Sequence, residues 1–165
     1  MTITLPRPRI FGPKVPGVLV IGLLAAQFAF FGSGNSPETK CTLNVERPHH
    51  STYLKEYKQL DAIKLNITSS CNVPQTYTQI TSSIFKIENN QEVIAHNFPS
   101  TRAYSSLKSN TDAIFEGLFV QCKFGLRTSY SAAAKGFVML KGGQKYPVSG
   151  FSGKFEPVLC QIGAQ

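Results

Sequence analysis

The sequence predicts an all-β domain that is held by two disulfides and preceded by an N-terminal hydrophobic helix. Hydrophobic and polar residues alternate over many short segments, which is the pattern of half-buried strands. Four cysteines lie in phase with the hydrophobic residues of these segments. An uncharged hydrophobic run lies near the start of the chain, behind basic residues. The 165 residues are enough for one domain and a targeting segment.

The hydrophobic run covers residues 15–34 and carries no charge. Basic residues before it and none directly after it are typical of a signal peptide or a signal anchor. Its most hydrophobic part, Val18–Phe31, is 14 residues long, and this favours a cleaved peptide because about 20 residues are needed to span a bilayer. The whole run is long enough for an uncleaved anchor. Residues 1–34 are therefore expected to be a signal peptide or a signal anchor, with the rest of the chain outside the cytoplasm.

The exported part divides into a polar linker at residues 35–40 and an extracytoplasmic β-sandwich domain at residues 41–162. Seven or eight short strands with turns every 8–12 residues are typical of a sandwich. The stretch Ser51–Leu60 is the exception, because its hydrophobic residues have a helical spacing that predicts one or two helical turns.

The strands are predicted from residues that share one parity. Strands are expected at Leu43–Val45, Ala62–Cys71, both arms of a hairpin at 80–98, Ile114–Leu126, Ala133–Leu140, Lys145–Val148 and Val158–Ile162, with a turn at Gly142-Gly143. The hairpin is expected to turn at Asn89-Asn90. Within the long strand, Ile114, Phe124 and Leu126 share a parity, and we expect their side chains to be buried.

The cysteines Cys41, Cys71, Cys122 and Cys160 are expected to form two bridges, because an even number in an exported chain indicates disulfides. One pairing joins Cys41 to Cys71 and Cys122 to Cys160, and it fits if the first two strands are antiparallel neighbours. The rival pairing joins Cys71 to Cys122 and Cys41 to Cys160, and the second of these bridges would link the two ends of the domain. The domain is expected to be an immunoglobulin-like sandwich with two disulfides. The second pairing resembles the core bridge of immunoglobulin domains, although the chain has no Trp to pack on that bridge.

Several short motifs resemble those of small two-disulfide, all-β secreted or surface proteins of Gram-positive actinobacterial type. They are Cys41-Thr42-Leu43, Pro48 with Ser51, Cys71, Cys122, and Ala133, Lys135 and Gly136 before the Gly142-Gly143 turn. Proteins of this type are mostly of unknown function. The resemblance therefore implies the fold and export, and no activity.

No catalytic, metal or cofactor motif stands out in the sequence. The adjacent His49 and His50 follow a proline, and the nearest acids, Glu46 and Glu56, are not at a recognised ligand spacing. We expect a solvated loop pair. Ser152 does not fit the G-x-S-x-G pattern of a hydrolase nucleophile, because Lys154 occupies the last position. The protein is predicted not to be an enzyme and to need no cofactor or metal.

The formal net charge of +8 is scattered singly along the chain, without the basic stripe typical of nucleic-acid binding. Four tyrosines near predicted turns are possible binding residues, because exposed tyrosines are frequent interface anchors. They are Tyr53, Tyr57, Tyr104 and Tyr130. The expected partner is a protein or a cell-surface polymer, and also the membrane, through residues 15–34, if the segment is uncleaved.

The sequence thus predicts an exported or membrane-anchored, non-catalytic binding or structural module at the cell envelope. Two alternatives belong to other classes: a small secreted hydrolase or inhibitor, and an accessory subunit of a membrane complex. An extracellular or cell-surface location is expected in each case.

Overall fold

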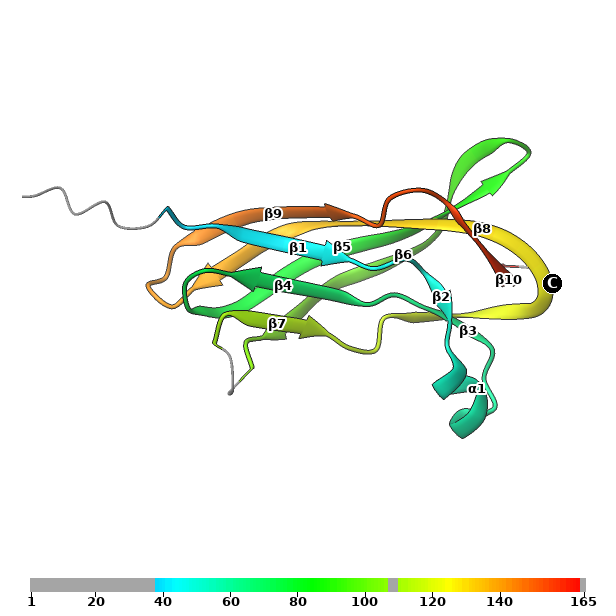
Figure 1. The fold of residues 1–165 in the computed structure, drawn as a ribbon, viewed down its shortest axis with the longest axis horizontal. Coiled ribbons are helices and arrows are strands. Elements are labelled where there is room, and N and C mark those ends of the chain that lie inside the picture. Colours follow the sequence, from blue (N-terminus) through cyan, green and yellow to red (C-terminus); the bar gives the residue numbers. More distant parts are fainter. Residues whose placement is uncertain (1–37, 107–109, 164–165) are drawn as a thin grey trace, which may run out of the picture. The chain divides into compact units, whose positions relative to one another are not determined.

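The computed structural model describes residues 38–106 and 110–163. The predicted signal peptide or anchor at residues 1–34 lies outside the described residues. The described part is mostly β, with two sheets, one helix and two disulfides (Figure 1). Its elements are β1 (Cys41–Val45), β2 (His49–His50), α1 (Thr52–Lys58), β3 (Ala62–Lys64), β4 (Ile67–Cys71), β5 (Gln75–Glu88), β6 (Gln91–Tyr104), β7 (Asp112–Phe115), β8 (Phe119–Leu140), β9 (Lys145–Phe151) and β10 (Glu156–Ile162). In this part of the chain, α1 is too short and too polar to cross a membrane, and no other helix is present.

The strands form a small sheet and a large sheet, and all pairs are antiparallel. The small sheet has the order β1-β4-β7, and these strands lie side by side in Figure 1. The large sheet has the order β2-β3-β8-β5-β6, with β9 and β10 also paired to β8. β8 is therefore the central strand of the large sheet, because it pairs directly with β3, β5, β9 and β10.

Several predicted elements are confirmed. β5 and β6 form the expected hairpin, and both turn residues, Asn89 and Asn90, have the positive φ that a tight hairpin turn requires. α1 covers the stretch with helical spacing. It begins after Ser51, whose hydroxyl accepts a hydrogen bond from the Leu54 amide at 3.3 Å. It ends at Gln59, which adopts a left-handed conformation.

The prediction of one strand over Ile114–Leu126 is wrong. The chain leaves β7 after Phe115, turns at Gly117 with a φ of +77°, and enters β8 at Phe119. The turn changes which positions in the alternation are buried. In β7, Ala113 and Phe115 are buried and Ile114 is exposed. The separate strand expected at residues 133–140 is the second half of the same 22-residue β8.

Phe124 and Leu126 were predicted to be buried, and both are exposed. They lie where the pairing of β8 with β10 shifts between Val158 and Cys160. β8 is strongly curved in Figure 1 (yellow). Gly125 has a φ of +94° in this stretch, which fits an irregularity that bends one strand of a pair. The curve turns these two side chains away from the core.

The two disulfides join Cys41 to Cys71 and Cys122 to Cys160, which is the first of the two pairings considered. Cys41 and Cys71 are opposite each other in the register of β1 and β4. The second bridge links β8 to β10 next to the curve. All four cysteines belong to the hydrophobic core or pack against it.

The two sheets pack against each other around one hydrophobic core, which includes residues of both. β1 of the small sheet lies against β9 of the large sheet. A Cβ atom at Gly150 would lie 2.2 Å from the carbonyl oxygen of Leu43 and 2.8 Å from a methyl group of Val45. Only a glycine allows this approach without a shift of the backbone.

Tyr130 was predicted to lie near a turn as a possible binding residue, and this prediction is wrong. Its side chain is fully buried in the middle of β8. The hydroxyl donates to the carbonyl oxygen of Cys160 at 3.0 Å and accepts from the amide of Ile162 at 2.7 Å. Burial raises the pKa of the Tyr130 phenol above its ordinary value. Tyr130 is a core residue that holds β10 against β8.

Candidate binding face

The large sheet has one face on the core and one face directed away from it. Along β5, the side chains of Ile80, Ser82 and Ile84 are buried, whereas Thr81 and Ser83 between them are partly or fully exposed. The same alternation continues on β8 around Val138 and on β9 around Val148. The exposed side of β6, β5, β8 and β9 is therefore a continuous four-strand surface.

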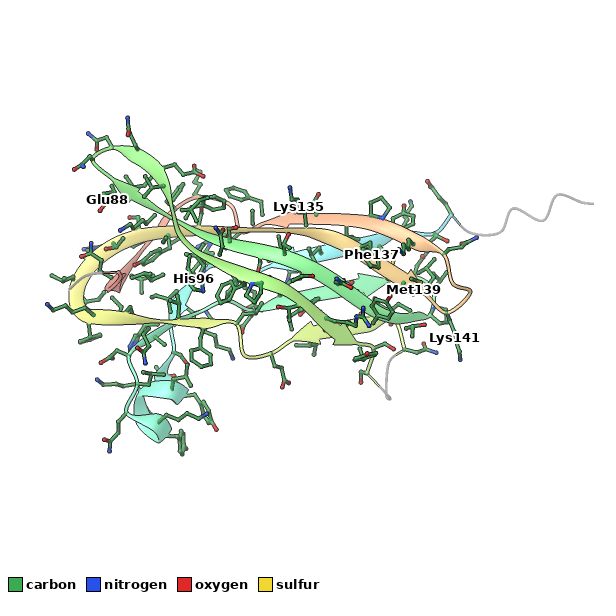
Figure 2. All side chains as sticks on the ribbon, turned by 180° about the vertical axis from the view of Figure 1, so that it is seen from behind. Glu88, His96, Lys135, Phe137, Met139 and Lys141 are labelled. Carbon is green, nitrogen blue, oxygen red and sulfur yellow. A yellow bond between two sulfur atoms is a disulfide. The ribbon has the colours of Figure 1, made fainter. Side chains whose placement is uncertain are left out.

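We call this surface the outer face. Its side chains are Ser100, Arg102 and Tyr104 from β6; Tyr77, Gln79, Thr81, Ser83 and Phe85 from β5; Ala133, Lys135, Phe137 and Met139 from β8; and Lys145, Pro147, Ser149 and Phe151 from β9. Figure 2 shows Lys135, Phe137 and Met139 following one another along β8.

The middle of the outer face is hollowed. Two cavities of about 750 and 650 Å³ adjoin there and share Thr81, Lys135 and Ser149 as lining residues. Small side chains at Thr81, Ser83 and Ser149 surround Lys135 in the middle, while larger rings stand at both ends. Phe137 lines one end, and Phe85 and Phe151 line the other. The hollow is therefore a groove that runs along the strands.

Two cations at one end of the groove lie over aromatic rings. The Arg102 guanidinium carbon lies 4.3 Å from the centre of the Tyr77 ring, and the Lys145 ammonium nitrogen lies 4.9 Å from the centre of the Phe137 ring. The two rings meet edge to face, with their centres 6.2 Å apart. Attraction between a cation and an aromatic ring holds long, flexible side chains in place.

Hydrogen bonds hold the polar side chains of the same region. The Arg102 guanidinium donates to the Gln79 side-chain oxygen at 3.1 Å, and the Gln79 amide donates to the Ser100 hydroxyl at 2.9 Å. A guanidinium has five N–H groups, so most of those on Arg102 are left for other acceptors.

The outer face is positively charged. It carries Arg102, Lys135 and Lys145, and no aspartate or glutamate stands among its side chains. None of the ion pairs in residues 38–106 and 110–163 includes any of these three cations. Their charge is thus directed to solvent without a carboxylate to offset it.

The structure brings only one of the four predicted tyrosines to the outer face. Tyr104 lies there, 66% exposed, with its ring 6.0 Å from that of Tyr77. Tyr53 and Tyr57 are also exposed, but they form a separate pair on α1 with ring centres 4.9 Å apart. A third cavity of about 580 Å³ lies beside Tyr53, and its charged lining residues are of both signs.

The sequence interpretation missed the residues that form the outer face. Tyr77, Phe137, Arg102, Lys135 and Lys145 lie on strands, and the aromatic residues of strands were assigned to the core. The alternation along each strand could have identified them. Tyr77 and Phe137 are directly next to the buried Thr78 and Val138, so their side chains point to the opposite face of the sheet. Apolar residues of both parities make the two faces hard to distinguish without the register.

His50 is not the solvated loop residue that we expected. β2 pairs with β3, and this places the His50 Nε2 atom 2.9 Å from Oδ1 of Asp61. The Lys55 ammonium lies 2.6 Å from Oδ2 of the same carboxylate, and the His50 ring packs 5.2 Å from the ring of Phe124. The hydrogen bond from Lys55 is the largest cause of a lowered Asp61 pKa, and burial opposes it. His49 remains exposed, and its Nδ1 atom lies 3.1 Å from the Arg47 carbonyl oxygen.

This cluster predicts a difference between the two adjacent histidines. His50→Ala should lower the melting temperature by several degrees, because it removes a partner of Asp61, whereas His49→Ala should leave it unchanged. Asp61 has a lower pKa in the folded state than in the unfolded state, so its stabilising contribution is complete above the unfolded value and is lost as the pH falls below about 4. The melting temperatures of wild type and Asp61→Asn should therefore differ at pH 6 and converge toward pH 2. Equal effects of the two histidine variants would contradict this account.

No group of three or more histidine, cysteine, aspartate or glutamate side chains in the described part of the chain is arranged to hold a metal ion. Comparison with known proteins finds no matching family model, curated protein or solved structure. The arrangement of the outer face is therefore the main guide to function.

Proposed function

We propose that this protein is a non-catalytic binding module that works outside the cytoplasm, at the cell envelope, and that the outer face is its binding surface. The observation that carries the proposal is the groove in a sheet face that holds three cations and no carboxylate. A surface of this kind needs neighbouring anions or polar groups to offset its charge.

Export is supported by the cysteines and the N-terminal segment together. Two disulfides are consistent with an extracellular location, because bridges form and persist in oxidising compartments. The uncharged run at residues 15–34 supports a signal peptide or a signal anchor. The protein is then either released or held at the surface by its first residues.

We regard the domain as an immunoglobulin-like sandwich. Support comes from two antiparallel sheets around one core, with the close approach of β1 to β9 at Gly150. The disulfides each join two strands that pair within one sheet, so the bridge across the sheets that antibody domains have is not part of the proposal.

The positions of the titratable side chains favour a binding function over hydrolysis. His50 and Asp61 are engaged with each other and with Lys55 beside α1, away from the residues that line the groove. The outer face offers three cations, and the groove is lined by hydroxyls and aromatic rings, which recognise a ligand without supplying a general acid or base.

The experiment fills the groove with a large side chain. Ser149 lies exposed at its centre, so Ser149→Trp should block a ligand while leaving the buried side of β9 unchanged. Full-length protein in detergent should sediment with the detergent-insoluble fraction of envelopes from the cells that produce it, so that a membrane anchor does not contribute, and Ser149→Trp should reduce the bound fraction at least tenfold.

Asn44→Trp is the matched control, because Asn44 is exposed on β1 in the other sheet. It should bind like the wild type. Equal loss in both variants, or no loss in Ser149→Trp, would overturn the assignment of the outer face. Both variants should first show the wild-type melting temperature.

A further inference from the structure

We infer that the ligand of the outer face is an anionic polysaccharide, which lies along the groove with its acidic groups against Arg102, Lys135 and Lys145. This inference rests on the proposed function and names the class of ligand. It is argued from charge, from the way the cations are held, from the length of the groove and from the hydroxyl groups in its lining.

The charge of the face selects an anionic partner. Arg102, Lys135 and Lys145 come from three different strands, so that the positive charge covers the width of the face. In the register of β8 with β9, Lys135 is opposite Ser149 and Lys145 is opposite Met139. The two lysines are thus four residues apart along the strands, or about 13 Å at roughly 3.3 Å per residue. Cations at such intervals match a chain with repeated acidic groups better than a single small anion.

Two of the cations are positioned in advance. Arg102 lies over Tyr77 and Lys145 over Phe137, and Gln79 accepts a hydrogen bond from Arg102. Side chains that are already ordered lose less conformational entropy when they bind an anion. In these contacts the cations cover the faces of the two rings. The main role of the rings is therefore to hold the charged side chains in position.

The groove suits an extended chain. It runs from Phe137 to Phe85 along β8 and β5, and its lining covers residues 79–85 of β5, which is about 20 Å of strand. Between the aromatic ends, the hydroxyl groups of Thr81, Ser83 and Ser149 lie beside Lys135 in a lining that is otherwise mainly apolar. Hydroxyl groups both donate and accept hydrogen bonds, and this property matches the hydroxyl groups of a sugar.

Other polymers fit this surface less well. A protein partner usually places large apolar anchors at the centre of its interface, whereas here the large side chain at the centre is the charged Lys135 and the phenylalanines stand at the ends. Single-stranded nucleic acid binds by stacking bases on free aromatic faces, whereas Arg102 and Lys145 cover the faces of Tyr77 and Phe137. Both remain outcomes that the test can reveal.

The test measures binding of the full-length protein by isothermal calorimetry. The probes are polygalacturonate, its fully methyl-esterified form, polyglutamate and an oligodeoxythymidine. We expect binding to polygalacturonate that weakens as salt is raised, and at least tenfold weaker binding to the other three. Lys135→Gln combined with Lys145→Gln should weaken polygalacturonate binding at least tenfold. Lys58→Gln combined with Lys154→Gln changes the net charge equally at exposed sites outside the groove and should have no effect.

Each other outcome has a definite meaning. Equal binding of polyglutamate or the oligonucleotide would overturn the assignment to a polysaccharide, and equal binding of the esterified polymer would overturn the role of charge. Equal loss in both double variants would show a general charge effect and overturn the site. If no polymer binds while Ser149→Trp still loses envelope binding, this inference fails and the proposed function stands.

Discussion

Cys122→Ala combined with Cys160→Ala should lower the free energy of unfolding by about 4 kcal/mol, the loop-closure entropy of a bridge of this span. The bridge joins residues 38 positions apart, and Cys160 is fully buried beside the curve of β8. Domains of this size are stabilised by roughly 5–15 kcal/mol in total, so the loss is a large share. The melting temperature should fall by about 15 °C, at roughly 4 °C per kcal/mol.

The measurement is a thermal melt followed by circular dichroism. Cys41→Ala combined with Cys71→Ala is the comparison, because its separation of 30 residues gives nearly the same loop-closure entropy. The wild type, denatured without reductant, should show no free thiol. A double variant that melts within about 2 °C of the wild type would contradict the stabilising role of the bridge.

Gly150→Ala should destabilise the domain by about 3 kcal/mol, at the upper end of the usual cost of overpacking. The new methyl group would lie 2.2 Å from the Leu43 carbonyl oxygen, and backbone cannot move aside as the end of a flexible side chain can. β1 and β9 would have to separate, and this would loosen the contact between the two sheets.

Gly142→Ala is the control for this substitution. Gly142 lies in the turn between β8 and β9, and a Cβ atom there would have no neighbour within 4 Å. Its free energy of unfolding, measured by urea denaturation, should stay within about 0.5 kcal/mol of the wild type. Similar values for the two variants would mean that the sheets are not in close contact at Gly150.

Local patterns in the sequence predicted those parts of the fold that depend on interactions between residues close together in the chain. Alternation placed Ile63, Leu65 and Ile67 on a buried face, and all three are buried. The asparagine pair gave the hairpin turn because a tight turn needs residues that tolerate a positive φ. The pairing of Cys41 with Cys71 followed from two neighbouring antiparallel strands.

The parts of the fold that were predicted wrongly depend on pairing between strands that are far apart in the sequence. The run Arg127–Ser131 is polar enough to indicate a turn, but it continues β8 because β10 and β5 pair with it. Tyr130 is buried for the same reason. A buried hydrogen-bonded group made by Ser69, Gln75 and Thr78 also has no pattern in the sequence, since its members meet only after β4 and β5 have packed.

The outer face depends on the register of four strands, and no single segment contains it. Arg102 meets Tyr77, and Lys145 meets Phe137, only when β6, β5, β8 and β9 are aligned. Tyr104 could be proposed from its position near a turn. The three cations could not, because in the sequence they are scattered like ordinary surface residues.

The bridge between the first residue of β1 and the last residue of β4 determines how the domain responds to mechanical load. A pull applied to the chain before Cys41 passes through the sulfur–sulfur bond directly to Cys71. β1 cannot be peeled from β4 at that end, and the residues between the two cysteines bear no tension. When the rest of the domain is stretched, those residues cannot lengthen. The extended chain with this bridge intact is thus about 100 Å shorter than the reduced chain, from 30 residues at roughly 3.5 Å each.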